Sequence, residues 1–383
     1  MSDHIPFEIQ SEIMNMLPIK SLLRFRSICK QWKSLIDSSD FIAHHNSSQQ
    51  QRHLLVSYYD NDYKQKYVSI VDDHTFPQQK VFLTVPVSVK EMLEYDDYRI
   101  ISSCHGLVCL YCDITHMAVI WNISIRKSVA VFVPRSDIYE TTLGFGVCRE
   151  TNDPKIVKIR YLNEWSRFDK VTCIPSQVEV FTLSTGVWRS PYGTNLPRKS
   201  FYYFPSDKVV VDGVLYWLAT IRNNMNDGFK LIVSFDMTSE EFREITLPDD
   251  LSQTSRHRIS MSYLGNSLVV CGYAKHAIYR DLSVWIMGGG VSNSFTKLFT
   301  ITPNAILRGF RKTGEPIIAI QEREFWRRLA VYEPYSKRID YLGIGGVGFQ
   351  FKVYPYKETL ILLGQPDNMV YNGSGRWRAR YSD

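Results

Sequence analysis

Two kinds of strand-like segment alternate along most of this chain, and each kind recurs about every 50 residues. The first is a turn residue followed by an apolar strand, and successive turn residues lie 48, 59, 52, 49 and 44 positions apart. The second follows 15 to 27 residues later and contains an aromatic residue, with intervals of 60, 54, 50 and 47 positions. The turn residues are Gly106, Pro154, Gly213, Gly265, Gly314 and Glu358, and the aromatic residues are Trp121, Phe181, Phe235, Trp285 and Tyr332.

Strand-rich units that repeat at this period are typical of propeller blades, especially kelch-like ones. An earlier copy begins at Leu54, and the spacing between residues 54 and 375 then predicts seven blades, with six as the alternative. We expect the ends of this region to pair and close the ring. A two-sheet sandwich is the competing fold, but it seldom needs so many residues and its strands need not recur at a fixed period.

The N-terminal segment has helical rather than strand periodicity. Residues 5–42 contain 18 apolar residues out of 38. Ile9, Ile13 and Leu17 lie on one helical face, and Pro18 ends that helix. Two further short helices follow, the first with Ser21 as a candidate N-cap. The sequence therefore predicts an α+β chain in which a small three-helix unit precedes an all-β region.

A helical unit of about 40 residues is marginally stable by itself. It also carries more apolar side chains than so small a unit can bury internally. Part of its surface must therefore contact something else. Either the helices cap the β region, or they form a docking face for another protein.

The residues of this segment resemble the F-box. Ile5-Pro-Phe-Glu-Ile9 matches the opening of the family motif, Leu17-Pro-Ile-Lys-Ser-Leu-Leu-Arg-Phe25 its second part, and Ile28-Cys-Lys-Gln-Trp32 its third. The resemblance covers about 40 residues without gaps. It implies docking to the Skp-type adaptor of a cullin-RING ubiquitin ligase. The implied adaptor contacts are Pro6, Ile9, Ile13, Leu17, Pro18, Leu22, Leu23, Cys29 and Trp32, some of which must instead hold the helices together.

The remainder resembles the F-box-associated, kelch-like region of plant F-box proteins. The similarity rests on 104–110, 121–126, 143–146, 213–217, 235–240, 284–287 and 354–360. Asn122 is followed by Ile123 instead of the usual proline, and Gly288-Gly-Gly290 replaces a charged-aromatic turn. These departures concern single loops. The expected domains are an F-box at 1–42, a linker at 43–53, a substrate-recognition propeller at 54–375 and a basic tail at 376–383.

In a propeller, the loops between the two kinds of segment all lie on one face. Two of them combine aromatic and charged residues, which are the types enriched at interface hot spots. Either tryptophan could instead fold back over a blade edge. The candidate substrate-binding residues are Trp165, Arg167, Phe168, Phe325, Trp326 and Arg327.

The charge pattern gives no indication of a nucleic-acid or membrane partner. The net charge is +6, but residues 1–45 contain five acidic and five basic residues. The excess is therefore spread thinly over the rest, and only residues 376–380 are densely basic. No apolar run approaches the ~20 residues that cross a bilayer, and the first ten residues lack the apolar core of a secretory signal. Seven cysteines without framework spacing favour reduced thiols in the cytoplasm or nucleus.

No motif predicts catalysis, a cofactor or a metal. Gly343-x-Gly345-x-x-Gly348 satisfies a nucleotide-binding pattern, but a strand-like segment follows it where a helix is required. Cys104, His105, Cys109 and Cys112 lack a second ligand pair, and in a strand Cys109 and Cys112 would point to opposite faces. The metal constellation of a galactose-oxidase-like propeller enzyme is also absent.

We therefore expect a non-catalytic substrate-recognition subunit of an SCF-type ubiquitin ligase, which presents a protein substrate for ubiquitination and degradation. The alternative is a stand-alone propeller that binds a protein or glycan, with the N-terminal helices only capping it.

Overall fold

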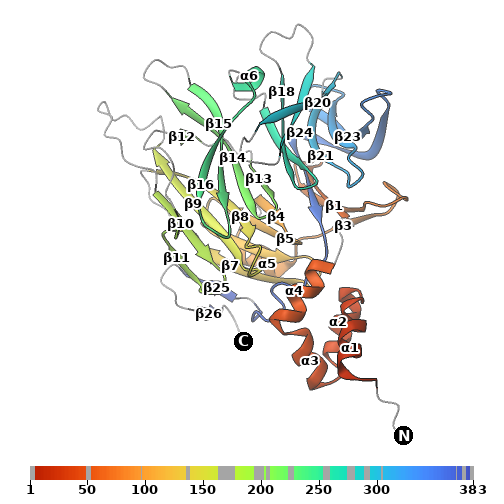
Figure 1. Ribbon diagram of the computed structural model, residues 1–383, viewed down its shortest axis with the longest axis vertical. Coiled ribbons are helices and arrows are strands. Elements are labelled where there is room, and N and C mark those ends of the chain that lie inside the picture. The colour runs from red at the N-terminus through yellow and green to blue at the C-terminus, as the bar shows by residue number, and fades with distance from the viewer. Residues whose placement is uncertain are drawn as a thin grey trace.

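The protein is represented by a computed structural model. It describes residues 5–48, 53–95, 97–134, 139–162, 177–193, 202–203, 208–222, 228–252, 259–273, 281–288, 294–302, 305–367, 369–372 and 377–379. A small cluster of helices projects from one side of a large β region (Figure 1). None of the described helices is long and apolar enough to cross a membrane.

Four helices, rather than the predicted three, are described at the N-terminus: α1 (Phe7–Asn15), α2 (Ile19–Arg26), α3 (Lys30–Ile36) and α4 (Ser39–Ser48). Pro6 and Pro18 occupy the N-caps of α1 and α2. Ser21 therefore lies inside α2 and is not its cap. A proline in this position begins the helix well because its fixed φ suits the entry and no N–H is left unpaired.

Helix α4 extends into the segment 43–53, which we expected to be a polar linker. Its polar residues His45 and Asn46 are buried. The His45 Nε2 atom lies 3.1 Å from the backbone oxygen of Leu17, and the Asn46 side chain bonds to the β region. A polar sequence thus forms a helix here, and tertiary partners pair with the buried Nε2 of His45 and Oδ1 of Asn46.

Apart from β12, β25 and β26, the described strands form six groups of four, which we number in chain order. Group 1 contains β1 (His53–Tyr59), β2 (Gln65–Val71), β3 (Lys80–Leu83) and the C-terminal part of β24 (Ile339–Tyr356). Group 2 contains β4 (Arg99–Cys104), β5 (Leu107–Cys112), β6 (Met117–Asn122) and β7 (Lys127–Phe132). Group 3 contains β8 (Tyr139–Val147), β9 (Pro154–Leu162), β10 (Gln177–Thr182) and β11 (Val187–Arg189). Group 4 contains β13 (Lys208–Val211), β14 (Val214–Arg222), β15 (Gly228–Asp236) and β16 (Phe242–Thr246). Group 5 contains β17 (Ile259–Leu264), β18 (Ser267–Tyr273), β19 (Leu282–Met287) and β20 (Phe295–Ile301). Group 6 contains β21 (Ala305–Phe310), β22 (Pro316–Gln321), β23 (Trp326–Tyr332) and the N-terminal part of β24.

Five short elements complete the description. Helix α5 (Val87–Leu93) packs on β6, and helix α6 (Asp249–Ser252) lies near β15. Strand β12 (Tyr202–Tyr203) pairs with β14. Near the C-terminus, β25 (Met369–Tyr371) pairs in parallel with β7, and β26 (Trp377–Ala379) pairs with β25. The segment expected to be a basic tail therefore contains a paired strand.

The two segments that repeat in the sequence correspond to the second and third strands of these groups. Gly106, Gly213, Gly265 and Gly314 lie in the turns between first and second strands, all at positive φ, where glycine is favoured. The five repeated aromatic residues all lie on the third strand of groups 2 to 6. The last expected copy, after Glu358, differs because residues 357–364 form no strand. This segment was counted as one of the repeats that favoured seven units, whereas the described strands form six groups.

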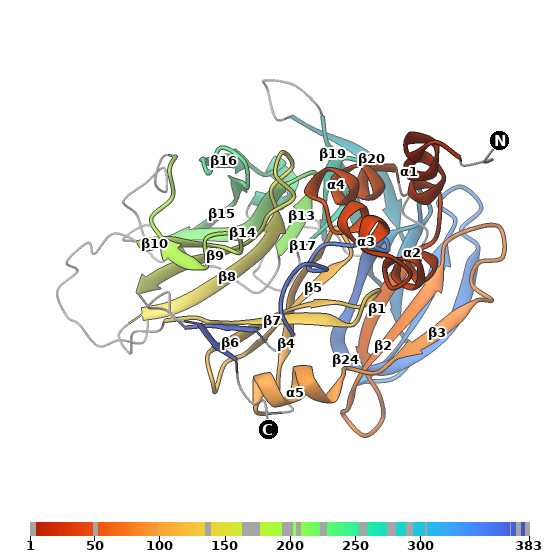
Figure 2. The ribbon, with the colours of Figure 1, turned by 90° about the horizontal axis from the view of Figure 1, so that it is seen from below.

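Strand β24 joins the two ends of the β region. Its first part pairs with β23 and its second part with β1, so these two groups share one seven-stranded sheet. A strand at the start of the region therefore pairs with one near its end, while β25, which lies closer to the end, pairs with β7. The first strands of the groups also contact one another in chain order, from β4 through β8, β13, β17 and β21 to β24, which contacts β4. In the view from below, the sheets surround a common centre (Figure 2).

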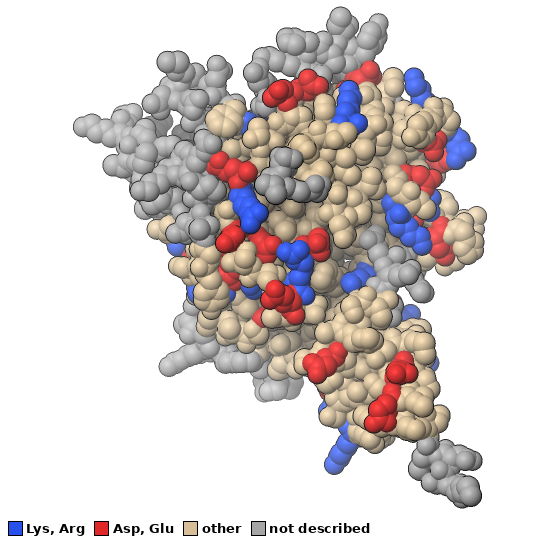
Figure 3. All heavy atoms as spheres, viewed as in Figure 1, with Lys and Arg blue, Asp and Glu red and all other residues tan. Residues whose placement is uncertain are grey.

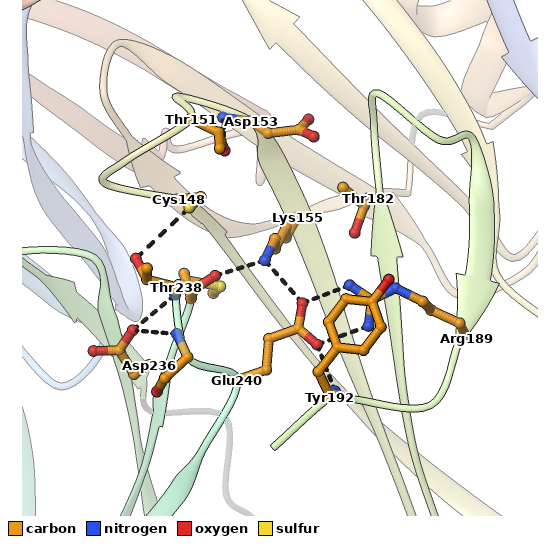
Figure 4. A network of polar contacts seen from close by, with 12 residues as sticks. Cys148, Thr151, Asp153, Lys155, Thr182, Arg189, Tyr192, Asp236, Thr238 and Glu240 are labelled. Carbon is orange, nitrogen blue, oxygen red and sulfur yellow. Dashed lines mark hydrogen bonds and ion pairs between the residues drawn. The ribbon is translucent and has the colours of Figure 1, made fainter.

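A buried polar network connects groups 3 and 4 (Figure 4). Glu240, in the turn after β15, accepts hydrogen bonds from Lys155 Nζ of β9 at 2.8 Å and from both terminal nitrogens of Arg189 of β11 at 2.7 Å. The backbone N–H of Tyr192 donates a further bond at 2.9 Å. The carboxylate is thus fully enclosed by donors from the neighbouring group, which is the arrangement that a buried charge requires.

Candidate docking surfaces

The largest apolar residues left exposed in the helical unit follow one side of α1. Ile5, Ile9, Ile13 and Met16 are 53%, 47%, 42% and 74% exposed. Ile9 and Ile13 lie on one side of α1, while Ile5 precedes its N-cap and Met16 is its C-cap, so the spacing of three or four residues continues past both ends of the helix. We call these four residues the α1 face. Ile28, in the turn before α3, is also exposed.

The structure separates the nine predicted adaptor residues into three sets. Leu22 is completely buried against Met14, Ile19 and Ile36, so it belongs to the core and cannot contact a partner directly. Sequence alone could not distinguish it, because the partly buried Leu23 next to it on α2 is the same residue type. Pro6, Ile9, Ile13, Pro18 and Cys29 are exposed, whereas Leu17, Leu23 and Trp32 are partly buried.

Trp32 and Cys29 have structural roles as well. The Trp32 indole N–H donates to Gln10 Oε1 at 2.9 Å, and its ring packs edge-on against Phe25, which connects α3 to α1 and α2. The Cys29 sulfur accepts a hydrogen bond from the Trp32 backbone N–H and so caps α3. Ile5, Met16 and Ile28 were not among the predicted contacts, although Ile5 and Met16 follow the same helical spacing as Ile9 and Ile13.

The other side of the helical unit packs on residues 357–363, which we call the junction segment. Leu360 and Leu363 are buried in the same hydrophobic cluster as Met14, Ile19 and Leu22. The Asn46 side-chain oxygen accepts hydrogen bonds from Thr359 Oγ1 at 2.9 Å and from the Leu360 N–H at 3.3 Å.

The junction segment is in turn held by group 2. Asn122 Nδ2 donates to the backbone oxygens of Thr359 and Ile361 at 2.9 and 2.7 Å. The helices are therefore attached to the β region through buried contacts, while the α1 face remains exposed. The two interpretations of the N-terminal unit, a cap on the β region and a docking face for another protein, therefore each describe one part of its surface.

The predicted substrate-binding residues fall into two loops. Trp165, Arg167 and Phe168 lie outside the described residues. Phe325 is 60% exposed at the edge of an open cleft of about 640 Å³ between β1, β23 and β24. The cleft is lined by Asn61, Glu322, Arg323, Glu324, Phe325, Trp326, Arg328 and Val347.

Arg327 does not face this cleft. It is 4% exposed and donates to Gln321 Oε1, because alternation along β23 turns it to the opposite side from its neighbours. Arg328 takes the position in the cleft that we expected for Arg327. Its guanidinium pairs with Glu322 at 3.0 Å.

Trp326 packs back onto the sheet, as the alternative interpretation allowed. A Cβ atom at Gly345 would lie 2.5 Å from the Trp326 ring, so only glycine permits this approach. The Gly348 N–H also donates to the Phe325 oxygen at 2.7 Å. The G-x-G-x-x-G pattern of β24 therefore serves strand packing in this structure.

The cysteine cluster lies inside group 2. Cys109 belongs to one hydrophobic cluster and Cys112 to another, on opposite faces of the sheet. Burial raises the pKa of the Cys104 thiol to about 11, which disfavours the thiolate form. Across the described ranges, no group of three or more metal-ligating side chains is present.

Each of the two parts of the chain matches a known domain family. A sequence model of the F-box domain matches residues 2–44, and a model of the F-box associated beta propeller domain matches residues 53–364. An F-box/kelch-repeat protein of Arabidopsis thaliana is 26% identical over 316 residues, which cover 78% of this chain and 79% of the relative. An F-box protein of the same organism is 29% identical over 296 residues, and the match covers 70% of this chain and 64% of that relative.

Among solved structures, TolB from Acinetobacter baumannii is similar over 85% of this chain and 72% of its own, with 9% identity and a TM-score of 0.42. This similarity is too low to bear on family or function.

Proposed function

This chain belongs to the F-box proteins that carry an F-box associated beta propeller domain, and on that premise we propose that it is the substrate-recognition subunit of an SCF-type cullin ubiquitin ligase. The F-box would dock a Skp-type adaptor, and the β region would hold a protein substrate. The transfer of ubiquitin would be carried out by other subunits. We place this activity in the cytoplasm or nucleus.

The α1 face is the observation that carries the proposal. Four large apolar side chains remain exposed on α1 and directly beside its ends, although the same unit buries Met14, Ile19 and Leu22 completely or nearly so. A contiguous apolar surface of this kind marks an interaction site in a soluble protein. Its position on the unit that matches the F-box model supports a Skp-type adaptor as its partner.

The junction segment supports the same function in a second way. A recognition subunit raises the local concentration of a substrate lysine near the conjugating enzyme, and it does so best when its two parts keep a fixed separation. The buried hydrogen bonds that Asn46 Oδ1 accepts, together with the packing of Leu360 and Leu363 against the helices, would hold the F-box in one orientation.

We also propose that the six strand groups are the blades of a closed propeller. The sequential contacts of the first strands and the pairing of β1 with β24 support a ring of six. The cleft beside Phe325 would then be one part of the substrate-binding surface. Its exposed aromatic ring and its mixed charges from Glu322, Arg323, Glu324 and Arg328 suit a protein partner.

The test is co-elution of the full-length protein with a purified Skp-type adaptor. Replacing Ile9 and Ile13 together by Asp should reduce adaptor affinity by at least about 100-fold, because two desolvated apolar contacts become buried charges. Ile114→Asp provides a matched control, since Ile114 is 54% exposed but lies on a turn of group 2. Its adaptor binding should equal that of the natural chain.

The alternative function is a stand-alone propeller whose helices only cap it, which the packing of the junction segment by itself would also allow. Failure of the natural protein to co-elute with the adaptor would favour that alternative. Unchanged co-elution of the Ile9→Asp, Ile13→Asp protein would show that the α1 face is not the docking site.

A further inference from the structure

Strand β3 is the fourth strand of group 1 and forms one edge of its sheet. Residues Lys80–Leu83 pair with β2 on one side, and β3 is the last strand in the order of this seven-stranded sheet. In the view from below, it lies at the outer rim of the β region (Figure 2). The free side of an edge strand presents backbone N–H and C=O groups that a further strand can bond.

This edge carries exposed apolar side chains. Val81 is 57% exposed and Phe82 is 69% exposed. The fourth strands of the other groups expose less: their exposed large apolar residues are Val187, Leu298 and Tyr341, at 39%, 40% and 48%. Proteins usually protect such edges with charged side chains, but β3 contains a single charged residue. Among the described fourth strands, β3 therefore presents the most exposed apolar edge.

The fourth strand of group 2 shows how such an edge is completed. Strand β7 pairs with β6 on one side and in parallel with β25 on the other, and its residues 128–131 are buried. Among the described strands, only β2 pairs with β3. Addition of a strand at the edge of a group is thus compatible with this fold, and the exposed side of β3 is open to it.

The hydrogen bonds between β2 and β3 show which backbone groups of β3 are left for another strand. The Val71 N–H donates to the Gln79 oxygen at 3.0 Å, so these two residues form a hydrogen-bonded pair at the start of the ladder. Hydrogen-bonded and non-hydrogen-bonded pairs alternate along antiparallel strands. The backbone N–H and C=O groups of Lys80 and Phe82 therefore point away from β2.

We propose that β3 pairs in antiparallel fashion with β3 of a second copy of this chain, across a two-fold axis at Phe82. In this register, the Phe82 residues of the two copies bond to each other through their outward-pointing backbone groups. Val81 lies opposite Leu83 of the other copy, and Lys80 lies opposite Thr84. Apolar residues therefore meet apolar residues, and no like charges are paired.

Self-complementarity favours a second copy over a strand of another protein as the occupant. The register centred on Phe82 matches the whole edge with itself. The other symmetric register, centred on Val81, places the charged Lys80 opposite Phe82. A two-fold contact also closes after two chains, so it covers both edges and leaves none for further association.

The proposed interface is small. Pro77 and Pro86 flank β3, and proline cannot donate to a strand ladder, so pairing is confined to the residues between them. Interfaces of this size give weak, reversible association, and we expect a Kd of about 1–100 µM. Dimerisation would place two recognition subunits in one assembly, which increases the avidity for a substrate with two binding segments.

Sedimentation equilibrium of the full-length protein measures the dimer. We expect a reversible monomer–dimer equilibrium in the Ile9→Asp, Ile13→Asp protein, in which the α1 face no longer favours self-association. Adding Phe82→Asp should weaken dimerisation by at least about 100-fold, because two carboxylates would meet at the axis. Adding Tyr335→Asp instead is the matched control, since Tyr335 is 98% exposed on the turn between β23 and β24, and dimerisation should not change.

A disulfide experiment tests the register. Phe82→Cys in a Cys29→Ser chain should form an intermolecular disulfide on oxidation with diamide, because the Cα atoms of a hydrogen-bonded pair are about 5.5 Å apart. Cys29 is replaced because it is the exposed thiol among the described cysteines. Val81→Cys in the same background is the control. Its two copies would be displaced by two positions along the strands and lie about 7–8 Å apart, so little disulfide should form.

The proposal is overturned if the Ile9→Asp, Ile13→Asp protein remains monomeric at about 200 µM, which would leave the edge to a strand of a different protein. It is also overturned if Phe82→Asp does not weaken the dimer, or if Val81→Cys forms the disulfide as readily as Phe82→Cys. Thermal unfolding of each variant verifies that it is folded. Dimerisation is measured on a chain whose α1 face is altered, so its outcome is independent of adaptor docking.

Discussion

At the residue scale, the buried carboxylate of Glu240 connects two strand groups through its hydrogen bonds. Burial by itself would raise the pKa of its carboxyl group, but hydrogen bonds from Arg189, Lys155 and the Tyr192 N–H outweigh that effect and lower the pKa to about 2 (Figure 4). In the unfolded chain, the carboxyl has its ordinary pKa near 4.5. Its stabilising contribution is therefore fully present above pH about 4.5 and is lost as the pH falls toward 2.

Glu240→Gln should lower the free energy of unfolding by roughly 3 kcal/mol at pH 7, because Lys155 and Arg189 would lose their buried counter-charge. Its stability should also fall less than that of the natural chain between pH about 4.5 and 2. Urea unfolding at several pH values measures both effects. Glu241→Gln is the control, since the side chain of Glu241 is 44% exposed and makes only a 3.5 Å ion pair. Equal stability of the two variants at pH 7 would contradict the role assigned to Glu240.

Residue identity predicted the helical unit better than it predicted the contacts within it. The prolines, the apolar spacing and the F-box resemblance indicated helices in the right segment. The same spacing could not separate Leu22, which is buried, from Ile9 and Ile13, which are exposed. Similarly, alternation along β23 exchanges the expected positions of Arg327 and Arg328, and no feature of the sequence indicates the phase of that alternation.

At the scale of elements, the connection between the F-box and the β region depends on α4 and the junction segment. Asn46→Ala should reduce the free energy of unfolding by about 1–3 kcal/mol, because the Thr359 hydroxyl and the Leu360 N–H would be left buried without their acceptor. The measurement is the thermal unfolding midpoint of the full-length chain. Ser47→Ala, at an exposed position of the same helix, should have little effect.

Adaptor co-elution should survive Asn46→Ala, because the α1 face does not include this residue. Loss of adaptor binding in a variant that remains folded would show that α4 contributes directly to docking. An unchanged midpoint would instead show that the Asn46 hydrogen bonds do not stabilise the junction.

At the scale of the whole molecule, β24 connects the end of the β region to its beginning. Gly346 lies where this strand passes from β23 to β1, and a Cβ there would be 2.4 Å from the Tyr59 backbone oxygen. Gly346→Ala should therefore cost about 1–3 kcal/mol of stability through displacement of the two strands. Chemical unfolding measures the change, and Gly364→Ala is the control because its added Cβ would meet no atom within 4 Å. Similar losses in both variants would contradict a special role for β24.

The sequence by itself determined the two-part organisation, the positions of the repeated turns and third strands, and the F-box resemblance, because these features depend on local spacing and residue type. Tertiary structure decided the rest. Residues 358–363 contain a run of apolar residues that resembles another strand, yet they form the junction segment because Asn46 and Asn122 bond their backbone and Leu360 and Leu363 complete the helical core. The partners of that segment lie more than 200 residues away in the chain. No local pattern could have shown that they would cover one side of the helices and leave the α1 face exposed (Figure 3 shows the helical unit as a separate projection).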